Sequence, residues 1–256
     1  MISLSQLIQQ FDHQQAMSIP ADWLQGRTVY GGLTAALALQ SVLWGIDNLP
    51  PLKSAAFAFV GPAAPSLTFQ ARCLRAGKSV TSVAVECNST LGPALNATMI
   101  FGQDRPSDVH YNPAIAPHVP PVAACDLWPL EATPDFLRHF EVRMAGKAFP
   151  LSQSADPDFM VWIRHQDASG VDPMVALVAL ADGLPPAAMN FFKTPAPIST
   201  ITWNFDILEP VPEGGWFLLR SRAEQARDGY STQTMEVWTE SGQRLLWGRQ
   251  NVAVFI

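Results

Sequence analysis

The chain has 256 residues, of which 48% are hydrophobic and 15% are charged, and its formal net charge is −6 at pH 7. It is long enough for a large core and contains no run of Lys or Arg, so we exclude nucleic acid as a partner. The three cysteines have no CxxC spacing, which favours reduced thiols and a cytoplasmic protein. The N-terminal sequence MISLSQLIQQFDHQQ does not resemble a signal peptide, and no apolar stretch is long enough for membrane insertion.

The first half of the chain predicts one helix surrounded by strands. Gly31 and Gly32 open the stretch 31–46, whose small and apolar residues are typical of a buried helix. β-type runs bounded by turn residues precede and follow this helix. They span residues 14–20, 54–60, 66–75, 79–87 and 94–102.

Residues 110–129 contain five prolines and show little periodicity, which predicts an extended linker. We therefore expect an N-terminal unit at residues 1–109, the linker at 110–129 and a C-terminal unit at 130–256.

The second half repeats the order of the first half. Residues 172–186, DPMVALVALADGLPP, predict the helix, with Asp172 as its N-cap and Pro173 at its first position. Hairpin turns join consecutive strands in both halves, which indicates antiparallel sheet and a duplicated α+β unit. The strands of this half are predicted at residues 158–166, 199–208, 216–225, 230–239 and 244–255.

Several stretches resemble the acyl-CoA thioesterase II family, and the similarity covers nearly the whole chain. They are GRTVYGGLTAALALQ and FVGPAAPSLTFQARCLRAGKSVTSVAVEC in the first half, and VWIR, ALADG and GRQNVAVF in the second. The resemblance implies a double hotdog, in which each antiparallel sheet wraps a central helix. It also implies hydrolysis of acyl-CoA without a metal or bound cofactor, by a protein that forms a homo-oligomer.

The resemblance further implies three catalytic positions in the second half, which hold the attacking water. The Asp at the end of the helix corresponds to Asp182, the hydroxyl residue of the next strand to Thr200, and the Gln of the last strand to Gln250. Ser199 and Thr202 replace Thr200 if the register is shifted.

The chemistry of these residue types agrees with such a site. Asp182 ends an apolar stretch with no basic residue within ten positions, and burial there raises the pKa of a carboxyl group towards that of a useful general base. Gly31 and Gly32 are the first residues of the predicted helix, so their backbone N–H groups have no partner within the helix. These groups can bind the substrate and its developing oxyanion.

The two helices, aligned without gaps, place Gln40 opposite Asp182. A neutral amide cannot act as a general base, and the counterpart of Gln250 is Ile100 or a neighbour. The duplication therefore predicts one working site in each chain.

Simpler interpretations of the same residues remain open at this point. Asp182 can reach solvent at the helix end, Thr200 can be an ordinary strand residue, and Gln250 can face outward. Gly31 and Gly32 can serve helix packing alone. The alternative functions are a non-catalytic acyl-CoA binding module and a hotdog lyase of the enoyl-CoA hydratase type, although no His lies in either helix.

Overall fold

The computed structural model describes residues 1–12, 14–129 and 133–255. Its longer helices are α2 (Gly31–Gly45) and α3 (Pro173–Ala181), and the chain starts with the short helix α1 (Leu4–Gln9). Short 3-10 helices are η1 (Ala21–Trp23), η2 (Val122–Ala124), η3 (Asp135–His139) and η4 (Ala187–Phe191). None of the helices in these residues has both the length and the apolar character needed to cross a bilayer.

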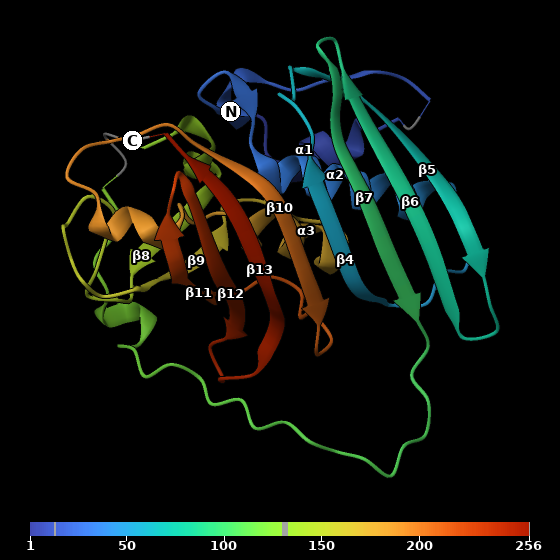
Figure 1. The fold of residues 1–256 in the computed structure, drawn as a ribbon. Helices are drawn as coiled ribbons and strands as arrows, with labels where there is room; N and C mark the ends of the chain where they lie inside the picture. The colour runs from blue at the N-terminus through green and yellow to red at the C-terminus, as the bar shows by residue number, and fades with distance from the viewer. Residues whose placement is uncertain (13, 130–132, 256) are drawn as a thin grey trace.

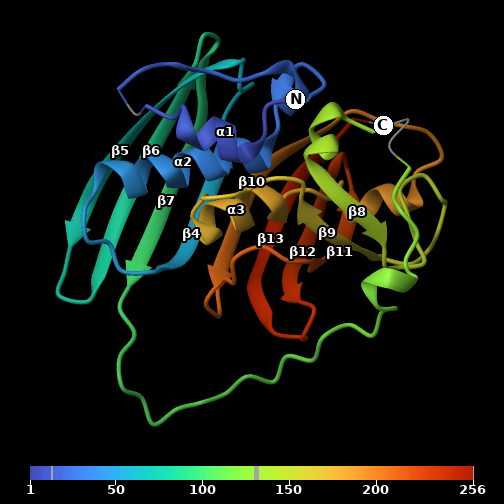
Figure 2. The same ribbon diagram turned by 180° about the vertical axis from the view of Figure 1, so that it is seen from behind.

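Eleven strands form one continuous antiparallel sheet in the order β1-β5-β6-β7-β4-β10-β13-β12-β11-β9-β8. Helices α2 and α3 lie against the same face of this sheet, behind it in Figure 1 and in front of it in Figure 2. The strands of the first half are β1 (Met17–Ser18), β4 (Leu52–Phe59), β5 (Ser66–Ala76), β6 (Val80–Ser89) and β7 (Gly92–Gly102). Those of the second half are β8 (Phe140–Met144), β9 (Asp158–His165), β10 (Ile198–Ile207), β11 (Phe217–Arg227), β12 (Tyr230–Thr239) and β13 (Arg244–Val254).

This architecture confirms the α+β double hotdog expected from the sequence. The two halves meet at β4 and β10, which pair directly over five residues. Phe57, Trp203 and Phe205 pack against one another at this junction, with ring centroids 4.8 to 5.8 Å apart. The halves therefore share a sheet and a core.

The strand pairings show the duplication in detail. Two of the β-bulges in each half lie at corresponding places, and they define which residues of the halves are equivalent. The bulges are Leu52/Ser54 and Cys73/Arg75 in the first half, and Thr200/Thr202 and Ala223/Gln225 in the second. Because a bulge bends its strand, the two halves of the sheet curve around their helices at the same points.

Close contact between the two helices depends on Gly32, in the first turn of α2. A Cβ atom there would overlap the Tyr30 hydroxyl oxygen and lie 2.8 Å from the carbonyl oxygen of Ala179 in α3. The Tyr30 hydroxyl donates a hydrogen bond of 3.0 Å to the same carbonyl. The start of α2 is thereby held against the last turn of α3.

Helix α3 ends at Ala181, five residues before the end of the predicted helical stretch. Asp182 is its C-cap, with φ −88° and ψ 8°, and Gly183 and Pro185 follow. Proline cannot continue a helix because it lacks the N–H and restricts the residue before it. The first strand is also shorter than predicted, since β1 contains only Met17 and Ser18.

Residues 103–121 contain no helix or strand and lead from β7 to the other half (Figure 1). After residue 121 the chain forms η2, and Leu127 then makes an isolated β-bridge with Arg143 of β8. Pro120 accepts a hydrogen bond from the Trp162 indole on the outer sheet face. The predicted boundary at residue 130 lies outside the described residues.

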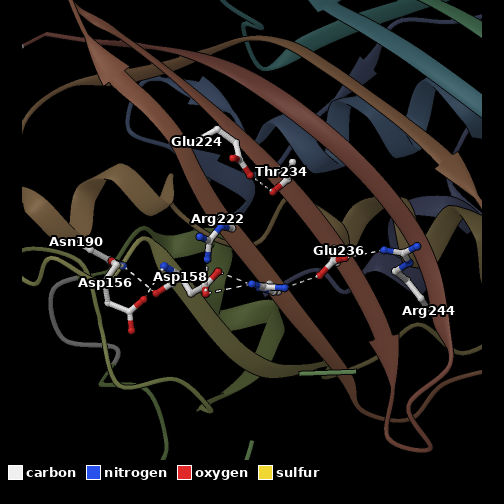
Figure 3. A network of polar contacts seen from close by, with 9 residues as sticks. Asp156, Asp158, Asn190, Arg222, Glu224, Thr234, Glu236 and Arg244 are labelled. Atoms are coloured by element: carbon white, nitrogen blue, oxygen red, sulfur yellow. Dashed lines mark hydrogen bonds and ion pairs between the residues drawn. The ribbon is translucent and has the colours of Figure 1, made fainter. Parts of the chain in front are cut away.

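The outer face of the second half carries an ion-pair network, shown in Figure 3. Asp158 of β9 binds Arg220 and Arg222 of β11, and Arg220 continues to Glu236 of β12. Glu236 also binds Arg244 of β13 at 2.8 Å. The network links four neighbouring strands and leaves the apolar face for the helices.

We expect Gly32→Ala to lower the free energy of unfolding by about 1 to 3 kcal/mol, because the added methyl overpacks the helix contact. Gly45→Ala is the matched control in the same helix, since a Cβ there meets nothing within 4 Å. This control should gain up to about 1 kcal/mol from helix propensity. Urea denaturation of both variants measures the difference, and equal midpoints would contradict the packing argument.

Candidate active site

The structure brings Asp182, Thr200, Gln250 and Gly31 to one cavity of about 340 Å³ at the junction of the two halves. The first half contributes the short hairpin of β2 (Leu24–Gln25) and β3 (Thr28–Val29), the start of α2 and the segment after β4. The second half contributes the residues after α3 and parts of β10 and β13. The other lining residues are Gln25, Thr28, Val29, Thr34, Phe59, Val60, Gly61, Pro62, Ala63, Ala94, Leu184, Pro185, Pro186, Ile198 and Ser199.

The Asp182 carboxylate points from the end of α3 towards the start of α2. Its Oδ1 accepts a hydrogen bond of 2.5 Å from Nε2 of Gln250, and the Gly32 N–H donates another to the carboxylate. Oδ2 lies so close to Gly31 that a Cβ atom on that residue would be 2.8 Å away. Gly31 therefore leaves space for the carboxylate, while Gly32 supplies both a hydrogen bond and the helix contact.

Burial raises the pKa of Asp182 from its ordinary value of 3.8 to about 7, because a charge is poorly solvated there. The hydrogen bonds from Gln250 and Gly32 stabilise the charged form and act in the opposite direction. Burial also raises the pKa of the neighbouring Tyr30, and the Asp182 charge raises it further, so the phenol stays neutral. None of the described residues that line the cavity is Lys, Arg or His.

A β-bulge directs Thr200 towards the cavity. Trp203 and Phe205 of β10 face the core, and strict alternation would turn Ile201 inward as well. The bulge between Thr200 and Thr202 reverses the alternation, so Ile201 is exposed and Thr200 pairs with the buried Val252. Of the three hydroxyl residues considered from the sequence, Thr200 and Ser199 line the cavity and Thr202 does not. Within the described residues, the Thr200 hydroxyl makes no hydrogen bond with Asp182 or Gln250.

Gln250 is 3% exposed and faces the core from β13. Its amide oxygen accepts a hydrogen bond of 2.8 Å from Nε2 of Gln233 in β12, directly opposite in the strand pairing. Gln233 was not among the site residues predicted from the sequence. The signal was present, because Gln233 shares the inward face of its strand with Met235 and Val237.

The equivalent cavity, between the first half and the start of α3, is lined mainly by apolar residues, and Asp172 is the charged residue in its described lining. The bulge correspondence makes Leu52 the counterpart of Thr200, and the strand register makes Met99, a neighbour of Ile100, the counterpart of Gln250. Leu52 lines a cavity at the start of α3 with Leu39, Leu43 and Phe101, and Gln40 is not among its lining residues. This half keeps the backbone geometry and lacks the polar side chains.

Several solved structures resemble this chain over most of its length. A protein of unknown function with a hot dog fold from Alicyclobacillus acidocaldarius is 26% identical, with a TM-score of 0.84 and coverage of 93% of this chain and 92% of that chain. A putative thioesterase II from Thermobifida fusca YX is 21% identical, with a TM-score of 0.81 and coverage of 94% and 92%. An acyl-CoA thioesterase II from Mycobacterium marinum is 18% identical, with a TM-score of 0.73 and coverage of 93% and 91%. These likenesses define the chain as a double hotdog protein.

Family models specify the class further. The model of the acyl-CoA thioesterase N-terminal domain matches residues 19–102, and that of the C-terminal domain matches residues 116–254. The chain belongs to the acyl-CoA thioesterase family and is an enzyme of thioester hydrolysis. Among curated proteins, no sequence matches it.

The raised pKa of Asp182 predicts how stability depends on pH. A carboxyl group with a higher pKa in the folded state stabilises the fold while it is protonated, and this contribution is lost as pH rises from about 4 to about 7. Asp182→Asn removes the titration, so its stability relative to wild type should rise by up to about 4 kcal/mol across this window and then level off. Urea denaturation at a series of pH values measures the difference. Parallel curves would show that Asp182 titrates normally.

Proposed function

We propose that the enzyme hydrolyses acyl-CoA thioesters by a water molecule that Asp182 deprotonates. The observation that carries this proposal is the buried Asp182 carboxylate, held by two hydrogen bonds at the wall of a cavity shared by both halves. Burial raises its pKa to about 7. A general base functions best when its pKa is near the working pH.

In the proposed reaction the water oxygen attacks the thioester carbonyl carbon while one water proton moves to the Asp182 carboxylate. The tetrahedral intermediate then collapses, the carbon–sulfur bond breaks, and the proton passes from Asp182 to the departing thiolate. The products are a free carboxylic acid and CoA, and Asp182 returns to its starting state.

Thr200 and Gln250 have the chemistry to position the attacking water. The Thr200 hydroxyl can both donate and accept, and it has no hydrogen-bond partner among the described residues. Gln250 donates one N–H to Asp182, and its oxygen accepts a hydrogen bond from Gln233. Its second N–H is therefore available for the water. Neither side chain can compete with Asp182 as a base.

The developing oxyanion requires a hydrogen-bond donor, and the start of α2 provides one in the Gly31 N–H. Gly31 lines the cavity, and its N–H makes no hydrogen bond within the described part of the chain. The positive end of the helix dipole stabilises negative charge at this position. Because the Gly32 N–H is occupied by Asp182, we assign the oxyanion to Gly31 alone.

A hydratase-type reaction has less support from this cavity. Such a lyase pairs its Asp with a His, and none of the described lining residues is a histidine. A module that only binds acyl-CoA would show no turnover, so the assay below separates it from the enzyme.

The proposal predicts thiol release from acyl-CoA by wild type and a loss of about 10²- to 10⁴-fold in kcat for Asp182→Asn. In wild type, kcat/KM should fall as pH drops through about 7, because the base must be deprotonated. Asp206 is an exposed carboxylate on the same strand as Thr200, so Asp206→Asn is the control variant and should keep full activity. Thiol release from a panel of acyl-CoA chain lengths, measured over a series of pH values, tests the loss in kcat and the pH dependence of kcat/KM. Full turnover in Asp182→Asn would refute the assigned mechanism.

The bulge makes Thr200 and Thr202 a matched pair on one strand. Thr200→Val should lower kcat by about 10-fold or more, as expected for the loss of about one hydrogen bond in the transition state. Thr202→Val should leave kcat unchanged, because this residue lies across the bulge and does not line the cavity. Thr200→Ser keeps the hydroxyl and should retain most of the activity. Equal effects of the two valine substitutions would contradict the role of Thr200.

A further inference from the structure

Gln233 is a polar residue that is fully buried in the core, with 0% of its surface exposed. It lies on the inward face of β12 with Met235 and Val237, behind Gln250 as seen from Asp182. An unpaired amide would be costly at such a place, so its hydrogen bonds must be satisfied inside the protein.

A chain of three hydrogen bonds satisfies them and fixes the direction of each amide. The backbone N–H of Ala187 donates to Gln233 at 2.9 Å, so the Gln233 atom that faces it must be the oxygen. The Gln233 NH₂ group therefore faces Gln250 and donates to its oxygen at 2.8 Å. This turns the Gln250 NH₂ group towards Asp182. The direction of the chain is set by a backbone group, which cannot reverse.

The first half shows that the fold does not require this polarity. Strand register makes Val83 the counterpart of Gln233, just as Met99 is the counterpart of Gln250. Both Val83 and Met99 are fully buried. Two buried amides thus replace two apolar residues only in the half that contains Asp182.

We propose that Gln233 is a positioning residue, which fixes Gln250 as a hydrogen-bond donor to the Asp182 carboxylate. The inference rests on the proposed role of Asp182 as the base. Without Gln233, the Gln250 amide can rotate and present its oxygen, which favours a protonated carboxyl group at Asp182. The free base would then form only at higher pH.

Few other groups compete for control of this titration. The hydrogen bonds that favour the charged form of Asp182 come from Gln250 and from the Gly32 N–H. Tyr30, the N-cap of α2, is the titratable neighbour and has a raised pKa. In the described lining, from the β2–β3 hairpin, α2, β10 and β13, Asp182 is the only charged side chain.

The test compares the pH dependence of kcat/KM for Gln233→Met, which conserves volume, with that of wild type. The acidic limb should move up by about one pH unit, and activity should approach the wild-type plateau above it. Gln250→Met should also move the limb, and Gln233→Met should add no further shift in that background, because Gln233 acts through Gln250. If Gln233→Met folds poorly, Gln233→Val is the second variant, because Val83 occupies the equivalent position in the first half.

Ser231→Ala is the matched control. Ser231 is also fully buried on β12, two residues away on the same face, and its hydroxyl has no partner in the described residues. This variant should keep the wild-type pH profile. A purely structural role for Gln233 would lower kcat/KM by the same factor at every pH, and that result would overturn the inference, as would a shift that persists in the double variant.

The outcome can be separated from the test of the base itself. If Asp182→Asn is inactive and Gln233→Met has an unchanged profile, only the role of Gln233 is wrong. The shift is also measurable without substrate. The pH window in which the protein loses stability relative to its Asp182→Asn counterpart should lie at higher pH in Gln233→Met than in wild type.

Discussion

The contact between the end of α3 and the start of α2 determines most of what this site can do. Gly32 and Tyr30 hold the two helices together, and the same contact brings Asp182 to the first backbone N–H groups of α2. A carboxylate at the C-terminal end of its own helix is disfavoured by that helix dipole, whereas the N-terminal end of the other helix stabilises it. Burial shifts the balance towards the neutral form. The resulting group is a weak acid that can take up and release a proton near neutral pH.

Much of the fold was predictable because its determinants are local. Period-two runs and glycine turns placed the strands of both sheets, and Gly31 and Gly32 marked the start of α2. The helix in the second half was predicted too long, since its apolar character continues past Asp182 while the Gly-Leu-Pro-Pro sequence ends the regular backbone. Strand order depends on pairings between distant residues, so it was not predicted from the pattern, and the family resemblance implied only the double hotdog.

The site was predictable in part for the same reason. The sequence pointed to Asp182, Thr200 and Gln250 through resemblance, and the structure places them at one cavity, while their catalytic roles remain proposals. The bulge that turns Thr200 inward could not be foreseen, because alternation alone assigns the inward position to Ile201. Gln233 was missed because its partners, Ala187 and Gln250, are 46 and 17 residues away along the chain. Strand alternation places Gln233 on the inward face, but its role becomes recognisable only when its hydrogen bonds are known.

Because β4 and β10 pair directly, the segment of residues 103–121 connects the two halves without determining how they are arranged. The contacts between the halves include five residue pairs of the sheet, an aromatic cluster, the packing of α2 against α3 and the stacking of Trp23 on His139, and none of these involves this segment. The covalent connection therefore raises the effective concentration of one half around the other, while the junction alone supplies the geometry. The chain thus resembles two subunits joined by a connecting segment, and cleavage of one peptide bond in that segment would leave the cavity around Asp182 assembled.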